Sequence, residues 1–113
     1  LEAVNSTTTK RIVVSIQNNG TLDFLRPDDV IEISCDLSRE GLKPVTPVKV
    51  PTAQKNMISC VKEYERLAVA AILQQDKSLA VRALMAHPLI GSYSLAKTLV
   101  EAYLDDEQFA AWR

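Results

Sequence analysis

The sequence predicts an α+β fold in which strands come before helices. In the first third of the chain, two stretches alternate apolar with polar residues, which is typical of strands with one buried face. Beyond residue 50, apolar residues recur three and four positions apart, which is typical of amphipathic helices. An order of strands followed by helices favours an antiparallel sheet over a parallel one. We therefore expect a small antiparallel sheet packed on a long helix, with two further helices.

Strands are expected between about residues 11 and 35. Asn18-Asn19-Gly20 follows the first alternating stretch, and because Asn-Gly favours tight hairpins we expect residues 21–25 to return as a second strand. Residues 42–50 contain Pro44 and Pro47, which exclude a central strand and predict an extended edge segment. The positions expected to face the core are Ile12, Val14, Ile16, Ile31, Ile33 and Cys35.

The long helix is expected at about residues 51–75. Pro51 suits the first helical position, since its missing N–H would have no partner there. The apolar face of the helix includes Cys60, which we expect to be a buried thiol like Cys35. Residues 67–73 are apolar without exception, so this part of the helix is expected to be enclosed on all sides.

Two shorter helices are expected at about residues 77–87 and 94–106. Asp76 or Ser78 is placed to cap the first of them, and Pro88 ends it. At the start of the chain, Leu1–Thr9 has the pattern of a helix end followed by a polar loop. At the other end, residues 109–113 are amphipathic and either fray or pack against the rest.

Size and charge limit the functions open to the chain. Its 113 residues suffice for one domain or less, and the net charge of −1 offers no basic surface of the kind that binds nucleic acids. The longest apolar run, residues 67–73, is far shorter than the ~20 residues that span a bilayer. We therefore expect neither nucleic acid nor membrane as a partner. Because the chain begins at Leu1 rather than at Met, we expect it to be a piece of a longer polypeptide.

Residues that could carry chemistry are few. The three glycines do not form a phosphate-binding loop, and a single histidine, His87, with two scattered cysteines does not form a metal site. His87 stands at a helix end, where it interacts with the helix dipole or simply packs. Asn18-Asn19-Gly20 is either a turn or a pair of amide side chains directed into a site completed by other sequence. No residue is therefore assigned a catalytic, cofactor-binding or metal-binding role.

Five short motifs, in this order, resemble the C-terminal part of glycoside hydrolase family 4. The resemblance extends from about Leu1 to Ala102, and within the family the sequence is most similar to the 6-phospho-β-glucosidases. The first motif is Asn18-Asn19-Gly20, and the second is the segment from Leu25 to Ile33 with Pro27, Asp29 and Glu32. The other three are Gly41-Leu42-Lys43-Pro44, Tyr64-Glu65-Arg66-Leu67 and Ala83-Leu84-Met85-Ala86-His87-Pro88-Leu89.

The resemblance implies a cytoplasmic enzyme of carbohydrate metabolism that hydrolyses 6-phospho-β-glucosides. Members of the family use NAD and a divalent metal, usually Mn²⁺, in place of two carboxylates. They take a hydride from C3 of the sugar, remove the acidified C2 proton, eliminate the aglycone, add water and return the hydride. The residues that bind NAD and metal and those that catalyse the reaction would precede Leu1, so residues 1–113 alone are expected to be inactive.

The resemblance also implies a fold and a site. The family is related to lactate and malate dehydrogenases, which makes residues 1–113 the C-terminal half of the substrate domain, with the long helix beside the active site. Asn18 and Asn19 are then candidate substrate-binding residues. One departure is Ala70, which stands where family members often carry a second glutamate in the long helix.

A second interpretation is a non-catalytic assembly or oligomerisation module with the same fold. Under either interpretation we expect a homo-oligomer. The reason is that surface suited to packing against other sequence would otherwise be exposed to water.

Overall fold

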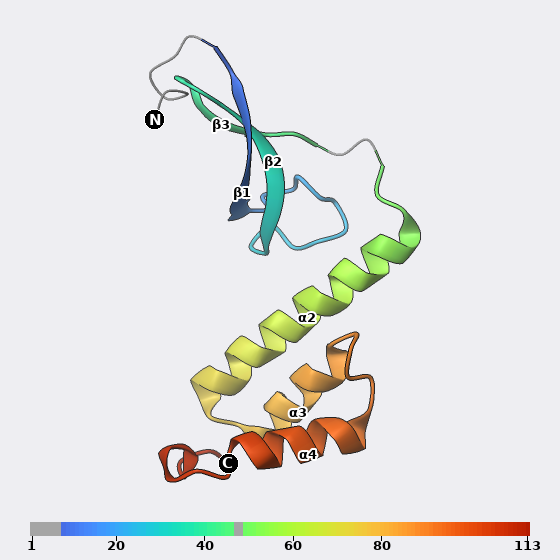
Figure 1. Cartoon of the computed structure of the whole chain (residues 1–113), viewed down its shortest axis with the longest axis vertical. Helices are drawn as coiled ribbons and strands as arrows, with labels where there is room; N and C mark the ends of the chain where they lie inside the picture. Colours follow the sequence, from blue (N-terminus) through green and yellow to red (C-terminus); the bar gives the residue numbers. More distant parts are fainter. Residues whose placement is uncertain (1–7, 47–48) are drawn as a thin grey trace. The chain divides into compact units, whose positions relative to one another are not determined.

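The computed structural model describes residues 8–46 and 49–113, which fall into two compact units divided between Val50 and Pro51 (Figure 1). Within the described residues, the first unit holds a three-stranded sheet and the second holds three α-helices. The predicted α+β class, with its antiparallel sheet and helices, is therefore confirmed. Most of the segment Leu1–Thr9, and also Pro47, lie outside the described residues, so the interpretations placed there are not tested.

The sheet is an antiparallel meander in the order β1-β2-β3. Strand β1 spans Lys10–Gln17, β2 spans Val30–Ser38 and β3 spans Gly41–Pro44. A tight turn joins β2 to β3, with Ser38 paired to Gly41. Pro44 ends an edge strand, where its missing N–H interrupts no ladder between two neighbours.

The register of β1 and β2 places the predicted core positions on one face of the sheet. Ile31 and Cys35 are buried, and the remaining positions of that face are half-buried. Val13 is the apolar residue that interrupts the alternation of apolar and polar residues in β1. It lies on the opposite face of the sheet and is exposed. The paired core positions are Ile12 with Cys35, Val14 with Ile33 and Ile16 with Ile31.

The prediction of a second strand at residues 21–25 was wrong. These residues belong to the loop that joins β1 to β2, from Asn18 to Asp29. The Asn-Gly pair does adopt positive φ, with Asn19 at 44° and Gly20 at 86°. The chain does not return as a strand, however, because hydrogen bonds from the Asn18 side chain hold the following residues in a closed loop.

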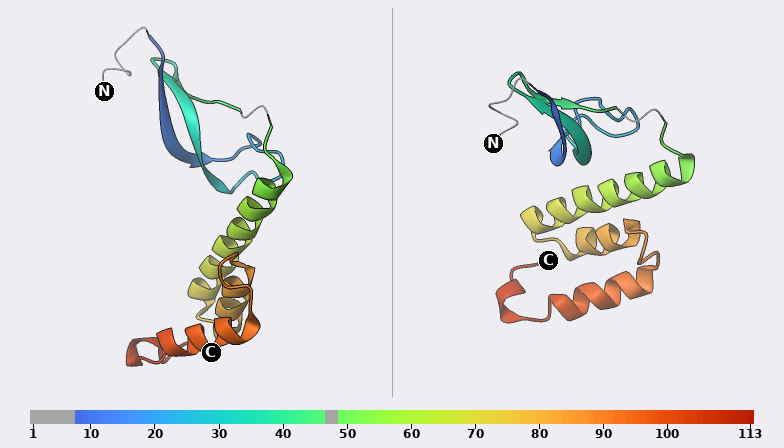
Figure 2. Two further views of the ribbon diagram at one scale, coloured as in Figure 1. Left: turned by 45° about the vertical axis from the view of Figure 1, so that its right-hand side comes forward. Right: turned by 45° about the horizontal axis from the view of Figure 1, so that its top comes forward.

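The helical unit contains α2 (Thr52–Gln74), α3 (Lys77–Ala86) and α4 (Tyr93–Tyr103), which lie side by side in both views of Figure 2. Pro51 is the residue before α2 rather than its first helical residue. Helix α4 ends at Tyr103, earlier than the predicted end near residue 106, and a short 3₁₀ turn (Glu107–Phe109) follows.

Side chains and backbone groups close the ends of the helices. The Asp76 carboxylate accepts a hydrogen bond from the Leu79 N–H at 3.1 Å, which identifies Asp76 rather than Ser78 as the cap of α3. Ser92 caps α4. The end of the chain packs rather than frays, because the Arg113 N–H donates to the Gln75 carbonyl at 2.8 Å and the Lys77 N–H donates to the Arg113 carbonyl at 2.7 Å.

Small residues form the core of the helical unit. Its buried apolar side chains are Ala71, Ala83, Ala96 and Val100, drawn from all three helices. Alanine at these positions removes side-chain bulk between the helices and so permits their backbones to approach closely. The unit therefore depends on close helix contact rather than on large interdigitating side chains.

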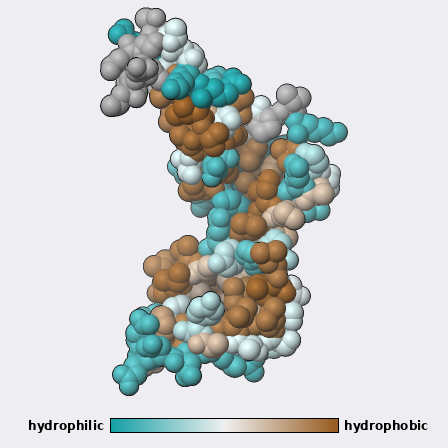
Figure 3. Space-filling view, viewed as in Figure 1, coloured by the Kyte–Doolittle hydropathy of each residue, from teal (hydrophilic) through white to brown (hydrophobic). Residues whose placement is uncertain are grey.

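Two predictions about burial on α2 were wrong. Cys60 is exposed, whereas Cys35 is buried as predicted. The stretch 67–73 is not enclosed by the described residues, since Ile72 is 63% exposed and Leu73 is 79% exposed. Cys60 precedes the part of α2 that lies along α3, since Tyr64 already contacts His87 at the far end of α3. Within residues 67–73 only one side is covered, where Ala71 is buried. Figure 3 shows apolar residues gathered on the surface of the helical unit.

The helices among the described residues are not long and apolar enough for any of them to cross a lipid bilayer.

Candidate functional site

Asn18 organises the loop between β1 and β2. Its side chain is fully buried, and its Nδ2 donates to the carbonyls of Leu22 at 2.9 Å and Arg26 at 3.1 Å. Its Oδ1 accepts from the Leu22 N–H at 2.7 Å. An amide group has two N–H donors and one carbonyl, so these contacts use the donors and part of the acceptor capacity within the loop. The Asn18 side chain therefore holds this loop closed.

Asp29 closes the other end of the same loop. The Asn18 N–H donates to the Asp29 carbonyl at 2.7 Å, and the Asn19 N–H donates to the Pro27 carbonyl at 2.9 Å. The Asp29 carboxylate, which is buried, accepts from the Arg26 N–H at 3.0 Å. Buried polar groups at both ends are thus satisfied by loop backbone, and the loop is a single hydrogen-bonded unit.

Asn19 differs from Asn18 in its surroundings. It is exposed, and its left-handed backbone turns the chain away from the buried Asn18. Of the two candidate substrate-binding residues, Asn19 is the one whose side chain is accessible for contact with another molecule. The sequence placed both in one motif and gave no signal that one is buried and the other exposed. A substrate-binding role for either residue stays a prediction.

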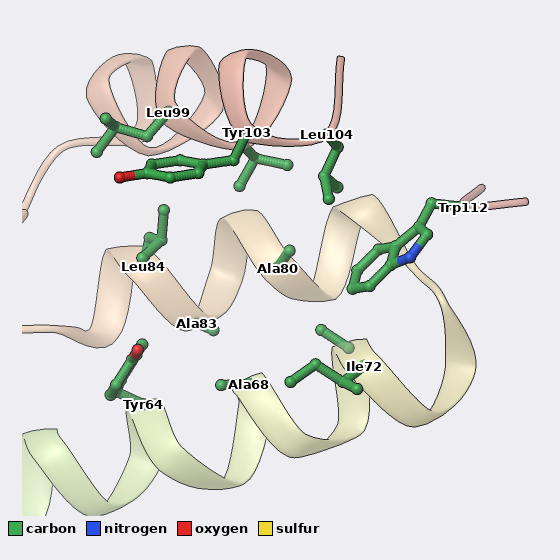
Figure 4. A pocket seen from close by; sticks show the side chains of 12 residues that line it. Tyr64, Ala68, Ile72, Ala80, Ala83, Leu84, Leu99, Tyr103, Leu104 and Trp112 are labelled. Carbon is green, nitrogen blue, oxygen red and sulfur yellow. The ribbon is translucent and has the colours of Figure 1, made fainter. Parts of the chain in front are cut away.

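A separate, apolar groove of about 370 Å³ lies in the helical unit (Figure 4). Its floor is made of alanines from α2 and α3, and its walls carry larger side chains from all three helices and from the end of the chain. Trp112, which sequence analysis did not single out, reaches the groove because the segment after α4 folds back. The lining residues are Tyr64, Ala68, Ala71, Ile72, Ala80, Ala83, Leu84, Leu99, Val100, Tyr103, Leu104 and Trp112.

His87 packs at the end of α3, as one of the two sequence interpretations proposed. Its ring meets the Tyr64 ring edge to face, with ring centroids 4.8 Å apart and planes at 87°. Its Nδ1 accepts a hydrogen bond from the Leu89 N–H at 3.2 Å. The imidazole therefore fixes the turn after α3, and its Nδ1 is engaged there.

The described residues do not provide a metal site. No group of three or more His, Cys, Asp or Glu side chains among them could hold a metal ion. Both cysteines are free thiols, and Ala70 is half-buried on α2. The residues present therefore do not fit the ligand set of a Mn²⁺ ion, and no step of the reaction is derived through one.

The sequence model of the family 4 glycosyl hydrolase C-terminal domain matches residues 1–90. The chain belongs to this family. The match covers the sheet, α2, α3 and the turn that contains His87, so it includes both the Asn18 loop and the residues of the Tyr64–His87 contact. Helix α4, which begins at Tyr93, follows the matched region.

Individual relatives agree with the family assignment. The 6-phospho-beta-glucosidase BglT of Thermotoga maritima is 36% identical over 93 residues, which cover 82% of this chain and 22% of BglT. The phospho-alpha-glucosidase PagL of Clostridium acetobutylicum is 23% identical and covers 91% of this chain and 23% of PagL. The chain thus spans less than a quarter of the length of these relatives.

A solved structure of a family member has the same fold. The structure of the 6-phospho-beta glucosidase from Thermotoga maritima with manganese, NAD⁺ and glucose-6-phosphate matches with a TM-score of 0.77 and 32% identity. The match covers 94% of this chain and 26% of that one.

Proposed function

We propose that this chain is the C-terminal part of a 6-phospho-β-glucosidase that depends on NAD and a divalent metal, and that residues 1–113 are inactive alone. One observation carries the choice of anomer: the chain is 36% identical to BglT but 23% identical to the α-glucosidase PagL. The domain assignment, a C-terminal fragment of the substrate domain spanning residues 1–113, and a cytoplasmic location belong to the same proposal.

We propose NAD and Mn²⁺ as cofactors because the structure of the Thermotoga maritima relative contains manganese, NAD⁺ and glucose-6-phosphate. In the whole enzyme, these groups would oxidise C3 of the sugar and polarise the resulting ketone. Because the described residues hold no metal-binding group, we assign the ligands to sequence outside this chain. This chain would supply helix packing and one wall of the sugar-phosphate site.

The test is an activity assay of the complete protein that contains this chain. Hydrolysis of nitrophenyl 6-phospho-β-glucoside is measured with and without NAD and Mn²⁺, beside the α anomer and the isolated residues 1–113. We expect cleavage of the β anomer only when both NAD and Mn²⁺ are present, and none by the isolated chain. Cleavage restricted to the α anomer would reject the β assignment, and no cleavage of either anomer would reject the glucosidase proposal.

We further propose that the loop from Asn18 to Asp29 contributes to substrate binding, with Asn19 in contact and Asn18 as a positioning residue. The support is the exposure of Asn19 beside a loop that Asn18 holds closed. Glycine readily adopts the left-handed backbone of Asn19, so Asn19→Gly removes the side chain without straining the turn. In the complete enzyme we expect a higher KM for the phosphoglycoside with kcat nearly unchanged. An unchanged KM would remove Asn19 from the substrate site.

One observation supports both a homo-oligomeric state and the second candidate function, which is a non-catalytic assembly module. Large apolar side chains are exposed on the helical unit, among them Ile72, Leu73 and Tyr103. Contiguous exposed apolar surface favours association with another protein surface. The assay above separates the two candidates, because an assembly module cleaves neither anomer under any condition.

A further inference from the structure

A second hollow, of about 230 Å³, lies between α3 and α4 and differs in chemistry from the apolar groove. The two are lined by different residues of α3, and only the buried Val100 of α4 lines both. One side of the α3–α4 pair therefore faces the apolar groove and another side faces this hollow. The residues that line it are Lys77, Ser78, Val81, Arg82, Met85, Tyr93, Lys97, Val100 and Glu101.

The rim of this hollow carries an excess of positive charge. Lys77, Arg82 and Lys97 stand against a single carboxylate, Glu101, which gives a net charge of +2. Lys97 and Glu101 approach to 3.9 Å, but their side chains are 55% and 66% exposed. An ion pair that is long and exposed is weak, so Lys97 remains available to another anion. This local excess contrasts with the whole chain, whose net charge is −1.

The side chains of Lys77 and Arg82 are also available to bind an anion. Neither side chain forms an ion pair with any other part of the chain that the structure describes. The nearest carboxylate in sequence, Asp76, accepts the hydrogen bond that caps α3. Cationic side chains at a concave surface attract anions, and Arg binds phosphate oxygens through two parallel N–H donors.

The floor of the hollow is apolar. Of its apolar lining residues, Val100 is buried and Val81 is half-buried, while Met85 and Tyr93 are 43% and 59% exposed. A ligand that fits this hollow needs an anionic group for the rim and an apolar or aromatic body for the floor. A phosphate monoester carries about −1.5 to −2 charges at neutral pH, which matches the net charge of the rim better than a carboxylate does.

We propose that the hollow between α3 and α4 binds a small phosphate monoester with an apolar or aromatic body. The proposal is independent of glucosidase activity, because it rests on the helical unit alone. Its size suits a compact ligand, since pockets for drug-sized molecules begin at roughly 300 Å³.

The probe is phenyl phosphate, titrated into the 113-residue chain and followed by calorimetry and by NMR shifts of the backbone amides of Met85 and Tyr93. Phenol lacks the charge and inorganic phosphate lacks the apolar body. We expect phenyl phosphate to bind at least about tenfold more tightly than either, because both parts of the site contribute. Equal affinity for phenyl phosphate and phenol, or for phenyl phosphate and inorganic phosphate, would overturn the proposal.

Two matched double variants locate the site. Arg82→Gln/Lys97→Gln removes two rim cations and is expected to weaken phenyl phosphate binding roughly tenfold. Lys10→Gln/Lys49→Gln makes the same change in net charge at exposed positions of the other unit and is expected to leave binding unchanged. Equal weakening by both double variants would mean that net charge alone attracts the probe, and the proposal would fail.

Glu101→Gln gives a test that does not depend on loss of binding. Removing the one carboxylate of the rim is expected to tighten phenyl phosphate binding by about two- to fivefold, in line with the energy of exposed charge pairs. A misfolded variant does not gain affinity, so this outcome cannot arise from unfolding. Unchanged or weaker binding by Glu101→Gln would contradict the proposed site.

Discussion

At the scale of single residues, the Asn18 amide decides the conformation of the segment between β1 and β2. The sequence offered the Asn-Gly signal of a tight hairpin, and the turn itself is present at Asn19 and Gly20. The return strand is absent because the Asn18 side chain binds Leu22 and Arg26. Hydrogen bonds from a side chain to residues four and eight positions away leave no periodic trace in the sequence, so pattern analysis could not find them.

In the Asn18→Ala variant, the loop should therefore unfold more readily than the sheet. The substitution leaves the Leu22 N–H and the Arg26 carbonyl without their partner, and we expect a loss of about 2–4 kcal/mol in the free energy of unfolding. Urea unfolding followed by circular dichroism measures the loss, and amide exchange at Leu22 locates it. Asn19→Gly is the control and should change stability by less than about 0.5 kcal/mol. Equal midpoints for the two variants would contradict this account.

The Arg11–Asp36 pair gives a prediction about pH. The Arg11 Nε donates to the Asp36 carboxylate at 2.9 Å across β1 and β2, and this hydrogen bond lowers the pKa of Asp36. A carboxylate with a lowered folded-state pKa stabilises the fold above its unfolded pKa, and that contribution is lost as pH falls through the folded pKa. The difference in stability between the natural chain and Arg11→Gln should therefore be present at neutral pH and vanish in acid.

An NMR titration of the Asp36 side chain checks this directly. We expect its pKa to rise toward the ordinary aspartate value in Arg11→Gln. Lys43→Gln, which changes a neighbouring exposed charge that pairs with Glu40, serves as the control and should leave the Asp36 pKa unchanged. The same Asp36 pKa in the natural chain and in Arg11→Gln would refute the assignment.

At the scale of helices, the stability of α3 depends on a single capping hydrogen bond that one substitution can remove. Asp76→Ala removes the acceptor for the Leu79 N–H and should lower the free energy of unfolding of the helical unit by about 0.5–2 kcal/mol. Asp76→Asn retains the acceptor and should lose much less. Thermal unfolding monitored at 222 nm distinguishes them, and equal losses would show that the charge of Asp76, rather than its hydrogen bond, stabilises α3.

The alanine contact between the helices is sensitive to volume. Ala96 is fully buried on α4 and lines neither of the two hollows, so a leucine there would force the helices apart at a cost of about 1–3 kcal/mol. Ala102→Leu, at an exposed position of α4, is the matched control and should be nearly neutral. Chemical denaturation of both variants provides the measurement. A neutral Ala96→Leu would mean that space remains at this contact.

Helix positions were predictable from the sequence to within a few residues, whereas burial on α2 was not. Periodicity identifies which side of a helix is apolar, and Ala71 on that side is indeed buried. Periodicity does not reveal how far the neighbouring helix extends or how many sides of α2 it covers, which is why the burial of Cys60 and of Ile72 was misjudged. The apolar groove could not be predicted either, because Trp112 enters it from a segment distant in sequence.

At the scale of the whole molecule, exposed apolar surface predicts self-association. Replacing Ile72 and Leu73 by lysine removes two exposed apolar side chains, each worth about 1.5–3 kcal/mol when fully buried. We expect the natural chain to associate in size-exclusion chromatography with light scattering, and the double variant to be monomeric at the same concentration. Gln74→Lys/Gln75→Lys is the control for added charge. A monomeric natural chain at high concentration would exclude association.

The family could be inferred from the sequence because its motifs occur in the correct order, from Asn18-Asn19-Gly20 to His87-Pro88. The site could be inferred only in part. This chain covers 22% of the length of BglT, so most groups that such an enzyme uses belong to other sequence. The candidate residues it does contain, Asn18 and Asn19, differ in burial, which a linear motif does not encode.

The hydrogen bonds of Arg113 couple the end of the chain to the turn between α2 and α3. Its N–H reaches Gln75 and its carbonyl accepts from Lys77, so it bridges the turn between α2 and α3. The bridge requires α3, α4 and the turn at Glu107–Phe109 to have brought the chain back, which is a loop closure with an entropic cost. The Lys77 N–H therefore has its carbonyl partner only while the chain end is folded back. The turn between α2 and α3 is thus held twice, by its own hydrogen bonds from Asp76 to Ala71 and from Gln75 to Ile72, and by the end of the chain.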